Sequence, residues 1–95
     1  MRKKINAILI HHRDNVITVI ESLHVGSAAR YQKDQGTEET IARDEIPKFH
    51  KMALVDIKES QPVYKYGQLI GEAIKAISKG SHVHDHNISS PKKIS

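Results

Sequence analysis

Three histidines near the C-terminal end of the chain have a spacing that could bind a metal ion. His82, His84 and His86 occupy alternate positions, and Asn87 follows them. In a β-strand, alternate side chains lie on one face, so His84 and His86, with or without His82, would present their imidazoles side by side. Neutral imidazole is a common ligand of divalent metals. Such a pair would need further ligands from elsewhere, and an exposed polar edge strand is the alternative interpretation.

Two further pairs place a cation beside a group that can transfer or donate a proton. At the start of a strand, His50 and Lys51 would offer a proton relay and a fixed charge for a carboxylate. An ordinary charged turn is the simpler interpretation. Lys65 and Tyr66 would offer an anion contact and a phenol donor, and packing of the Tyr66 ring is again the simpler interpretation.

The segments that must position these side chains are short and rich in β-branched residues. Residues 5–10 and 16–20 are apolar runs separated by an Asp-Asn pair that favours a turn, so they predict a hairpin. A third run at residues 28–32 could pair with this hairpin. The polar residues 33–39, which include one glycine, predict a loop or a wide turn.

A weak repeat recurs along the chain, in which an apolar residue, a turn position and a second apolar residue follow at intervals of three. The four copies are centred on Gly26, Phe49, Ser60 and Gly80, and each predicts a short turn that leads into a strand. Glycine suits the centre because such turns often require a positive φ, so Phe49 and Ser60 are the weak members. The flanking apolar pairs are Leu23 and Ala29, Ile46 and Met52, Ile57 and Val63, and Ile77 and Val83.

Residues 70–77 are ambiguous between helix and strand. Their apolar residues recur with helical spacing, at positions 70, 73, 74 and 77, but Gly67 and Gly71 weaken a helix here. A strand, a turn and a second strand fit the same residues. Taken with the other short runs and frequent turns, the pattern predicts a mainly β fold with at most one or two short helices.

Length and composition limit what the chain can do by itself. Its 95 residues, of which 38% are hydrophobic, predict one domain with a modest core. A domain of this size buries about 60–65% of its unfolded surface, which leaves little material for a deep enclosed pocket. We therefore expect a small domain that packs against a partner chain. The absence of cysteine excludes disulfides and thiolate metal sites.

Charge and hydropathy argue against two classes of partner. The net charge of +4 is dispersed except at the two ends, and three tyrosines and one phenylalanine are too few for a base-stacking surface. We therefore expect no nucleic-acid partner. No apolar stretch approaches the roughly 20 residues of a membrane helix, and the apolar start lacks a signal-peptide cleavage site. These features predict a cytoplasmic protein that makes no membrane contact.

In their order along the chain, these motifs resemble the N-terminal SAF-type domain of altronate and galactarate dehydratases. They are also similar to the small subunit of sulfolactate sulfo-lyase. The resemblance covers residues 5–88, and Phe49 and Ser60 depart from it by standing where the family usually has glycine. The matching motifs are Asp14-Asn15-Val16, Ile46-Pro47, His50-Lys51 with Ala53, Lys65-Tyr66-Gly67, Ile70-Gly71 with Ala73, Gly80, and Val83-His84-Asp85-His86-Asn87.

The resemblance implies a fold, a partner and a reaction. The implied fold is a SAF-type β-clip of short bent strands, with the SAF domain at residues 1–88 and a flexible C-terminal tail at residues 89–95. The implied partner is a separate, large catalytic dehydratase subunit, and a homo-oligomer stays open. The implied reaction eliminates water from a 2,3-dihydroxy sugar acid and depends on a divalent metal, Fe²⁺ or alternatively Mn²⁺.

The resemblance also implies roles for individual residues. The expected metal ligands are His84 and His86. The expected catalytic groups are His50, Lys51 and His86, and the expected substrate-binding groups are Lys65, Tyr66 and Asn87. Two alternatives stay open: a sulfolactate sulfo-lyase small subunit, from which sulfite leaves instead of water, and a non-enzymatic SAF-type module that binds a sugar acid or a metal.

Overall fold

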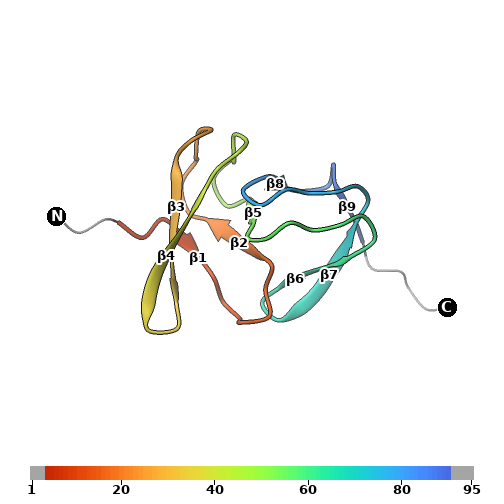
Figure 1. The fold of residues 1–95 in the computed structure, drawn as a ribbon, viewed down its shortest axis with the longest axis horizontal. Helices are drawn as coiled ribbons and strands as arrows, with labels where there is room; N and C mark the ends of the chain where they lie inside the picture. The colour runs from red at the N-terminus through yellow and green to blue at the C-terminus, as the bar shows by residue number, and fades with distance from the viewer. Residues whose placement is uncertain (1–3, 91–95) are drawn as a thin grey trace.

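The computed structural model describes residues 4–90, and these residues form nine short strands and no helix (Figure 1). The strands are β1 (Ala7–Ile8), β2 (Val16–Val19), β3 (Ala28–Lys33), β4 (Gly36–Ile41), β5 (Lys51–Ala53), β6 (Pro62–Lys65), β7 (Gln68–Ala73), β8 (His82–Val83) and β9 (Ile88–Ser89). The expected mainly β fold is confirmed. For residues 70–77 the strand–turn–strand alternative holds, because β7 ends at Ala73 and Ile77 forms an isolated bridge.

The strands form three small antiparallel sheets. The central sheet has the order β1-β2-β5-β8, with the β3-β4 hairpin toward one end of the molecule and the β6-β7-β9 sheet toward the other (Figure 1). The predicted hairpin of residues 5–10 and 16–20 is confirmed, since β1 pairs with β2. Strand β9 reaches Ser89, one residue beyond the expected domain boundary at residue 88. Residues 1–3 and residues 91–95 of the expected tail lie outside the described part of the chain.

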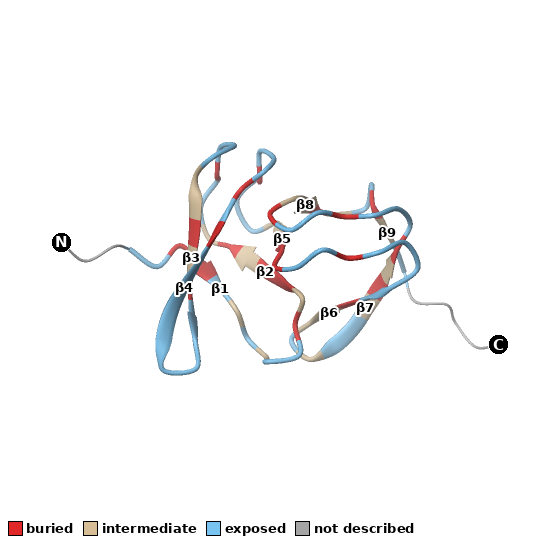
Figure 2. Ribbon diagram, viewed as in Figure 1, coloured by how far each residue is buried: buried red, intermediate tan, exposed pale blue. Residues whose placement is uncertain are grey.

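The expectations for residues 28–39 were met only in part. The run at residues 28–32 forms its ladder with β4, over six positions, and meets the first run through the Asn6 N–H, which donates to the Arg30 C=O. Most of the loop expected at residues 33–39 is strand β4, and the turn itself takes only Asp34 and Gln35. In β4 only Thr40 is buried, and Figure 2 shows the strand largely exposed. A strand with solvent on both faces keeps polar residues throughout, so its composition resembles that of a loop.

The predicted repeat is confirmed as four turns of one kind. The central residues Gly26, Phe49, Ser60 and Gly80 have φ values of 92°, 69°, 74° and 89°. In each turn, the N–H of the following residue donates to the C=O three residues earlier, at 3.0 Å in all four cases. A positive φ at the third position identifies a type II turn. The apolar residues on either side of each centre are buried.

Two hydrophobic clusters lie on opposite sides of the central sheet. Ile17 and Met52 belong to the first cluster, which also includes residues of β1 and β3. Val16 and Ala53 belong to the second, which includes residues of β6, β7 and β8. Adjacent residues of a strand point to opposite faces, so β2 and β5 contribute to both clusters. Figure 2 shows these central strands largely buried. The residues described contain no helix long and apolar enough to cross a membrane.

Candidate functional site

Three histidines meet where the central sheet reaches its edge strand, β8. His50 directly precedes β5, after the turn centred on Phe49. Antiparallel pairing of β5 with β8 sets Met52 opposite His82. The chain leaves β8 after Val83 and bends at His84. A pairing between residues about thirty positions apart therefore brings His50 to the other two histidines.

The imidazoles of His50, His82 and His84 form a stacked cluster. The Nδ1 atom of His50 and the Nε2 atom of His82 are 2.9 Å apart. The His50 and His84 ring centroids are 4.2 Å apart with an interplanar angle of 18°. One ring nitrogen from each residue lies within 4.8 Å of the other two, and the three residues are half-buried. Among residues 4–90, this is the group of three whose spacing could hold a metal ion.

One nitrogen of this cluster has no partner. The Nδ1 atom of His84 is buried and makes no hydrogen bond. Leaving a buried polar atom unsatisfied costs about 1–3 kcal/mol, so such atoms are rare unless a ligand completes them. A metal ion bound by one ring nitrogen of each residue would supply such a nitrogen with a partner. The donor set therefore fits a divalent metal that prefers nitrogen ligands.

The surroundings keep two of these imidazoles neutral. Burial is the main cause, and the neighbouring His86 the next, of a pKa for His82 lowered to about 4. His50 and His84 act in the same direction, while Asp44 opposes them. The pKa of His50 is lowered as well, first by burial and then by His84. Metal binding requires the neutral form, so these ligands need not lose a proton near neutral pH.

Positive charge lies next to the cluster. Lys51 is half-buried, and its pKa is lowered first by burial and then by the ammonium group of Lys65, while Asp85 raises it. The Nζ atom of Lys65 also lies 4.8 Å from the centre of the Tyr66 ring. The two lysines that the sequence singled out are thus near enough for the charge of Lys65 to lower the pKa of Lys51.

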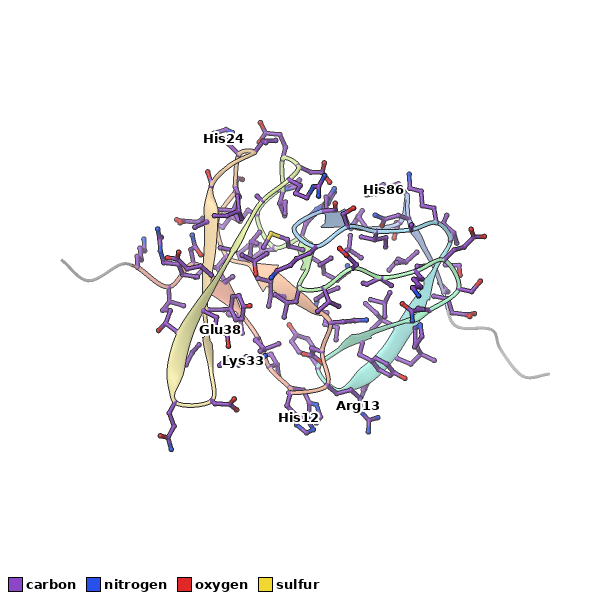
Figure 3. The ribbon with its side chains drawn as sticks, in the orientation of Figure 1. His12, Arg13, His24, Lys33, Glu38 and His86 are labelled. Carbon is purple, nitrogen blue, oxygen red and sulfur yellow. The ribbon has the colours of Figure 1, made fainter. Side chains whose placement is uncertain are left out.

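His86 lies beside the cluster and not within it. Its side chain is exposed, its ring centroid is 5.1 Å from that of His82, and Figure 3 shows it at the surface near β8. The sequence interpretation placed residues 82–86 on one straight strand. The chain instead turns at residues 84–87, so His84 approaches His50 while His86 points outward. The cluster thus joins His84 to His82, which the sequence analysis left as an optional ligand, and to His50, to which it gave a catalytic role.

Asn87 and Tyr66 both lie in turns whose backbone N–H groups donate to a buried side chain. The Asn87 side chain is 4% exposed, accepts a hydrogen bond from the His84 N–H and donates one to the His82 C=O. Tyr66 has a φ of 57° in the turn between β6 and β7, and its side chain is 53% exposed. The buried carboxylate of Asp14 holds this turn by accepting hydrogen bonds from the Tyr66 and Gly67 N–H groups.

Comparison with known proteins agrees with this architecture. Residues 5–91 match the family described as the altronate/galactarate dehydratase SAF domain. Altronate dehydratase of Bacillus subtilis is 38% identical over 80 residues, which are 84% of this chain and 15% of that enzyme. Galactarate dehydratase (L-threo-forming) of Escherichia coli is 31% identical over 85 residues, again 15% of its length. The chain thus corresponds to a small part of these dehydratases.

A second kind of relative is of similar size to this chain. The alpha subunit of (2R)-sulfolactate sulfo-lyase from Chromohalobacter salexigens is 32% identical over 88 residues, which cover 88% of this chain and 94% of that subunit. The relatives are thus lyases or parts of lyases, both as a domain of a long chain and as a subunit. The fold, the ordered motifs and these matches show that this chain belongs to the SAF-domain family of altronate and galactarate dehydratases.

Proposed function

We propose that this chain is the small subunit of a metal-dependent sugar-acid dehydratase of the cytoplasm and works with a separate large catalytic subunit. The observation that carries the proposal is the cluster of His50, His82 and His84 with a buried nitrogen that has no partner. The family relationship supports the reaction class, because the dehydratases that match are named for sugar acids.

The three clustered histidines would hold the metal ion. Nitrogens that are each about 2.1 Å from one ion lie about 3.0 Å apart at the 90° angle of octahedral coordination and about 3.4 Å apart at the tetrahedral angle. The His50 and His82 nitrogens, 2.9 Å apart, are close to the octahedral value. Fe²⁺ is our expectation and Mn²⁺ the alternative, and the large subunit would supply further ligands. The ion would act as a Lewis acid that polarises an oxygen of the substrate.

The neighbouring side chains would bind the acid and move its protons. Lys51 and Lys65 would fix the substrate carboxylate, and the exposed phenol of Tyr66 could donate to a hydroxyl group. The reaction removes the proton from the carbon next to the carboxylate and releases the hydroxyl of the following carbon as water. The exposed His86 imidazole is suited to proton transfer, since it can exchange protons with substrate and solvent.

The match to a sulfo-lyase subunit favours one alternative. The alpha subunit of Chromohalobacter salexigens aligns over 94% of its length, which supports a small subunit that works with a separate partner. In a sulfo-lyase the same proton is removed, but sulfite leaves instead of water. The groups proposed for the carboxylate and the proton would serve either reaction. A non-enzymatic module that binds a sugar acid or a metal is the third alternative.

Purification of the tagged chain with its partner would test the proposal. The complex, loaded with Fe²⁺, would be assayed on a panel of sugar acids and on sulfolactate, with keto-acid formation and sulfite release measured separately. We expect keto acid without sulfite from a sugar acid. Sulfite release would select the sulfo-lyase alternative, and a chain that binds ligands but yields no active complex would select the non-enzymatic one.

Substitution of single histidines would then test the site. We expect His84→Ala to abolish turnover, because it removes the imidazole whose buried nitrogen completes the cluster. The matched control is His24→Ala, which removes an exposed histidine that pairs with Glu45 in another turn. Equal activity of the His84→Ala and His24→Ala complexes would contradict the proposed role of the cluster.

A further inference from the structure

One asparagine side chain bonds twice to the backbone of the segment that carries two of the clustered histidines. Asn87 donates from Nδ2 to the C=O of His82 at 2.8 Å and accepts at Oδ1 from the N–H of His84 at 3.0 Å. Its amide therefore bridges residue i and residue i+2 of the same segment. These two backbone groups lie immediately beside the imidazoles of the cluster, so the bridge sets how the two rings are presented.

Asn87 is itself anchored to a different sheet. Its backbone C=O accepts a hydrogen bond from the N–H of Ile74, at the end of β7, at 3.0 Å. The His82 N–H also donates to the carboxylate of Asp44 at 2.9 Å. The backbone of His82 is thus bonded through both its N–H and its C=O. A shift of Asn87 would move His84 as well, because the N–H groups of Asn87 and Ile88 both donate to the His84 C=O.

The same amide bridge occurs elsewhere in the chain. Asn6 donates to the C=O of Ala28 and accepts from the N–H of Arg30, again residues i and i+2. Its side chain is 5% exposed, against 4% for Asn87. An asparagine amide carries a donor and an acceptor on two separate atoms, as this bridge requires. An ionised aspartate has no donor, and serine has a single, shorter hydroxyl. Asn6 belongs to the other end of the molecule, beside β3, and serves no histidine.

We infer that Asn87 is a positioning residue that holds His82 and His84 in the geometry that binds the metal ion, and that it does not contact the substrate. Both ends of its amide are already bonded to backbone, and its side chain is buried. The inference rests on the proposed metal site. It replaces the substrate-binding role that the sequence suggested, and it assigns to Asn87 a role exercised through the two histidines.

Cobalt titration of the full-length chain tests the inference. Co²⁺ binding would be followed by its visible absorption, and folding of the metal-free chain by thermal unfolding. Replacement of residues that orient metal ligands typically weakens metal affinity about 10–100-fold, so we expect Asn87→Ala to raise the Co²⁺ dissociation constant at least about tenfold. Asn6→Ala loses an equivalent bridge and should lower the melting temperature similarly while leaving Co²⁺ affinity unchanged.

Each outcome bears on a different claim. Equal Co²⁺ affinity of wild type and Asn87→Ala, or equal weakening by Asn6→Ala, would overturn the positioning role while leaving the metal site intact. A wild-type chain that fails to bind Co²⁺ would remove the metal site and this inference with it. If Asn87→Ala does not fold, Asn87→Ser replaces it, because the shorter hydroxyl cannot span both backbone groups and should weaken Co²⁺ binding by a similar factor.

Discussion

The four equivalent turns allow the strain at one of them to be measured against the others. Ser60 has a φ of 74°, and the corresponding position in two of the other turns is occupied by a glycine, Gly26 or Gly80. A left-handed backbone costs a residue other than glycine about 1–2 kcal/mol. Glycine in turn loses more conformational freedom on folding, which costs about 0.5–1 kcal/mol. We therefore expect Ser60→Gly to raise the free energy of unfolding by about 0.5–1 kcal/mol.

Thermal unfolding of the metal-free chain would measure this gain. For a domain of this size, 1 kcal/mol shifts the melting temperature by about 4–8 °C, so we expect a rise of roughly 2–8 °C. The control is Glu59→Gly, one position earlier in the turn, where φ is not positive and the side chain is exposed. Glu59→Gly carries the conformational-entropy cost of glycine without relieving any left-handed backbone, so its free energy of unfolding should fall. If Ser60→Gly were no more stable than Glu59→Gly, strain at this turn would be refuted.

Two further predictions concern backbone space and pH. Gly26→Ala should introduce backbone strain alone, because nothing lies within 4 Å of its added Cβ. Gly80→Ala would in addition set a Cβ against the carbonyl oxygen of Ile41, too close for van der Waals contact. Chemical denaturation should show Gly80→Ala to be the less stable by about 1–3 kcal/mol, and equal stabilities would contradict the close approach. For His82, the pKa falls from 6.5 in the unfolded chain to about 4 in the folded one. As the pH falls, the unfolded chain therefore protonates His82 before the folded chain does. The contribution of neutral His82 to the free energy of unfolding is complete above pH 6.5 and is lost as the pH falls toward 4. In the presence of a chelator, wild type should lose more stability over this range than His82→Gln, and parallel losses would contradict the lowered pKa.

The local features of the fold could be predicted from the sequence, and the turns show why. Each turn depends on three residues spaced three apart, so the apolar-turn-apolar repeat located all four centres, including Phe49 and Ser60. Strand β4 escaped prediction because its exposed residues carry no alternation between apolar and polar. Hydrophobic periodicity reports burial, and a strand exposed on both faces leaves no such signal.

The candidate site was only partly predictable because it depends on a nonlocal pairing. His84 could be chosen from the alternating histidines, but its neighbour His50 lies just before β5, about thirty residues earlier, and reaches it through the β5–β8 register. The straight strand assumed for residues 82–86 favoured His86 as the second ligand. The one local signal against that strand was Asn87, since asparagine readily bonds nearby backbone and promotes turns.

The two hydrophobic clusters explain how so small a domain can hold its histidines in place. Met52 lies in the first cluster and Val83 in the second, and both are fully buried. His50 lies two residues before Met52, and both His82 and His84 adjoin Val83. Movement of the imidazoles would therefore disturb packing on one side of the sheet or the other, which costs several kcal/mol for large buried side chains. The histidine cluster is exposed to solvent on the side where His86 lies. A partner chain that completes the metal coordination should therefore approach from that side.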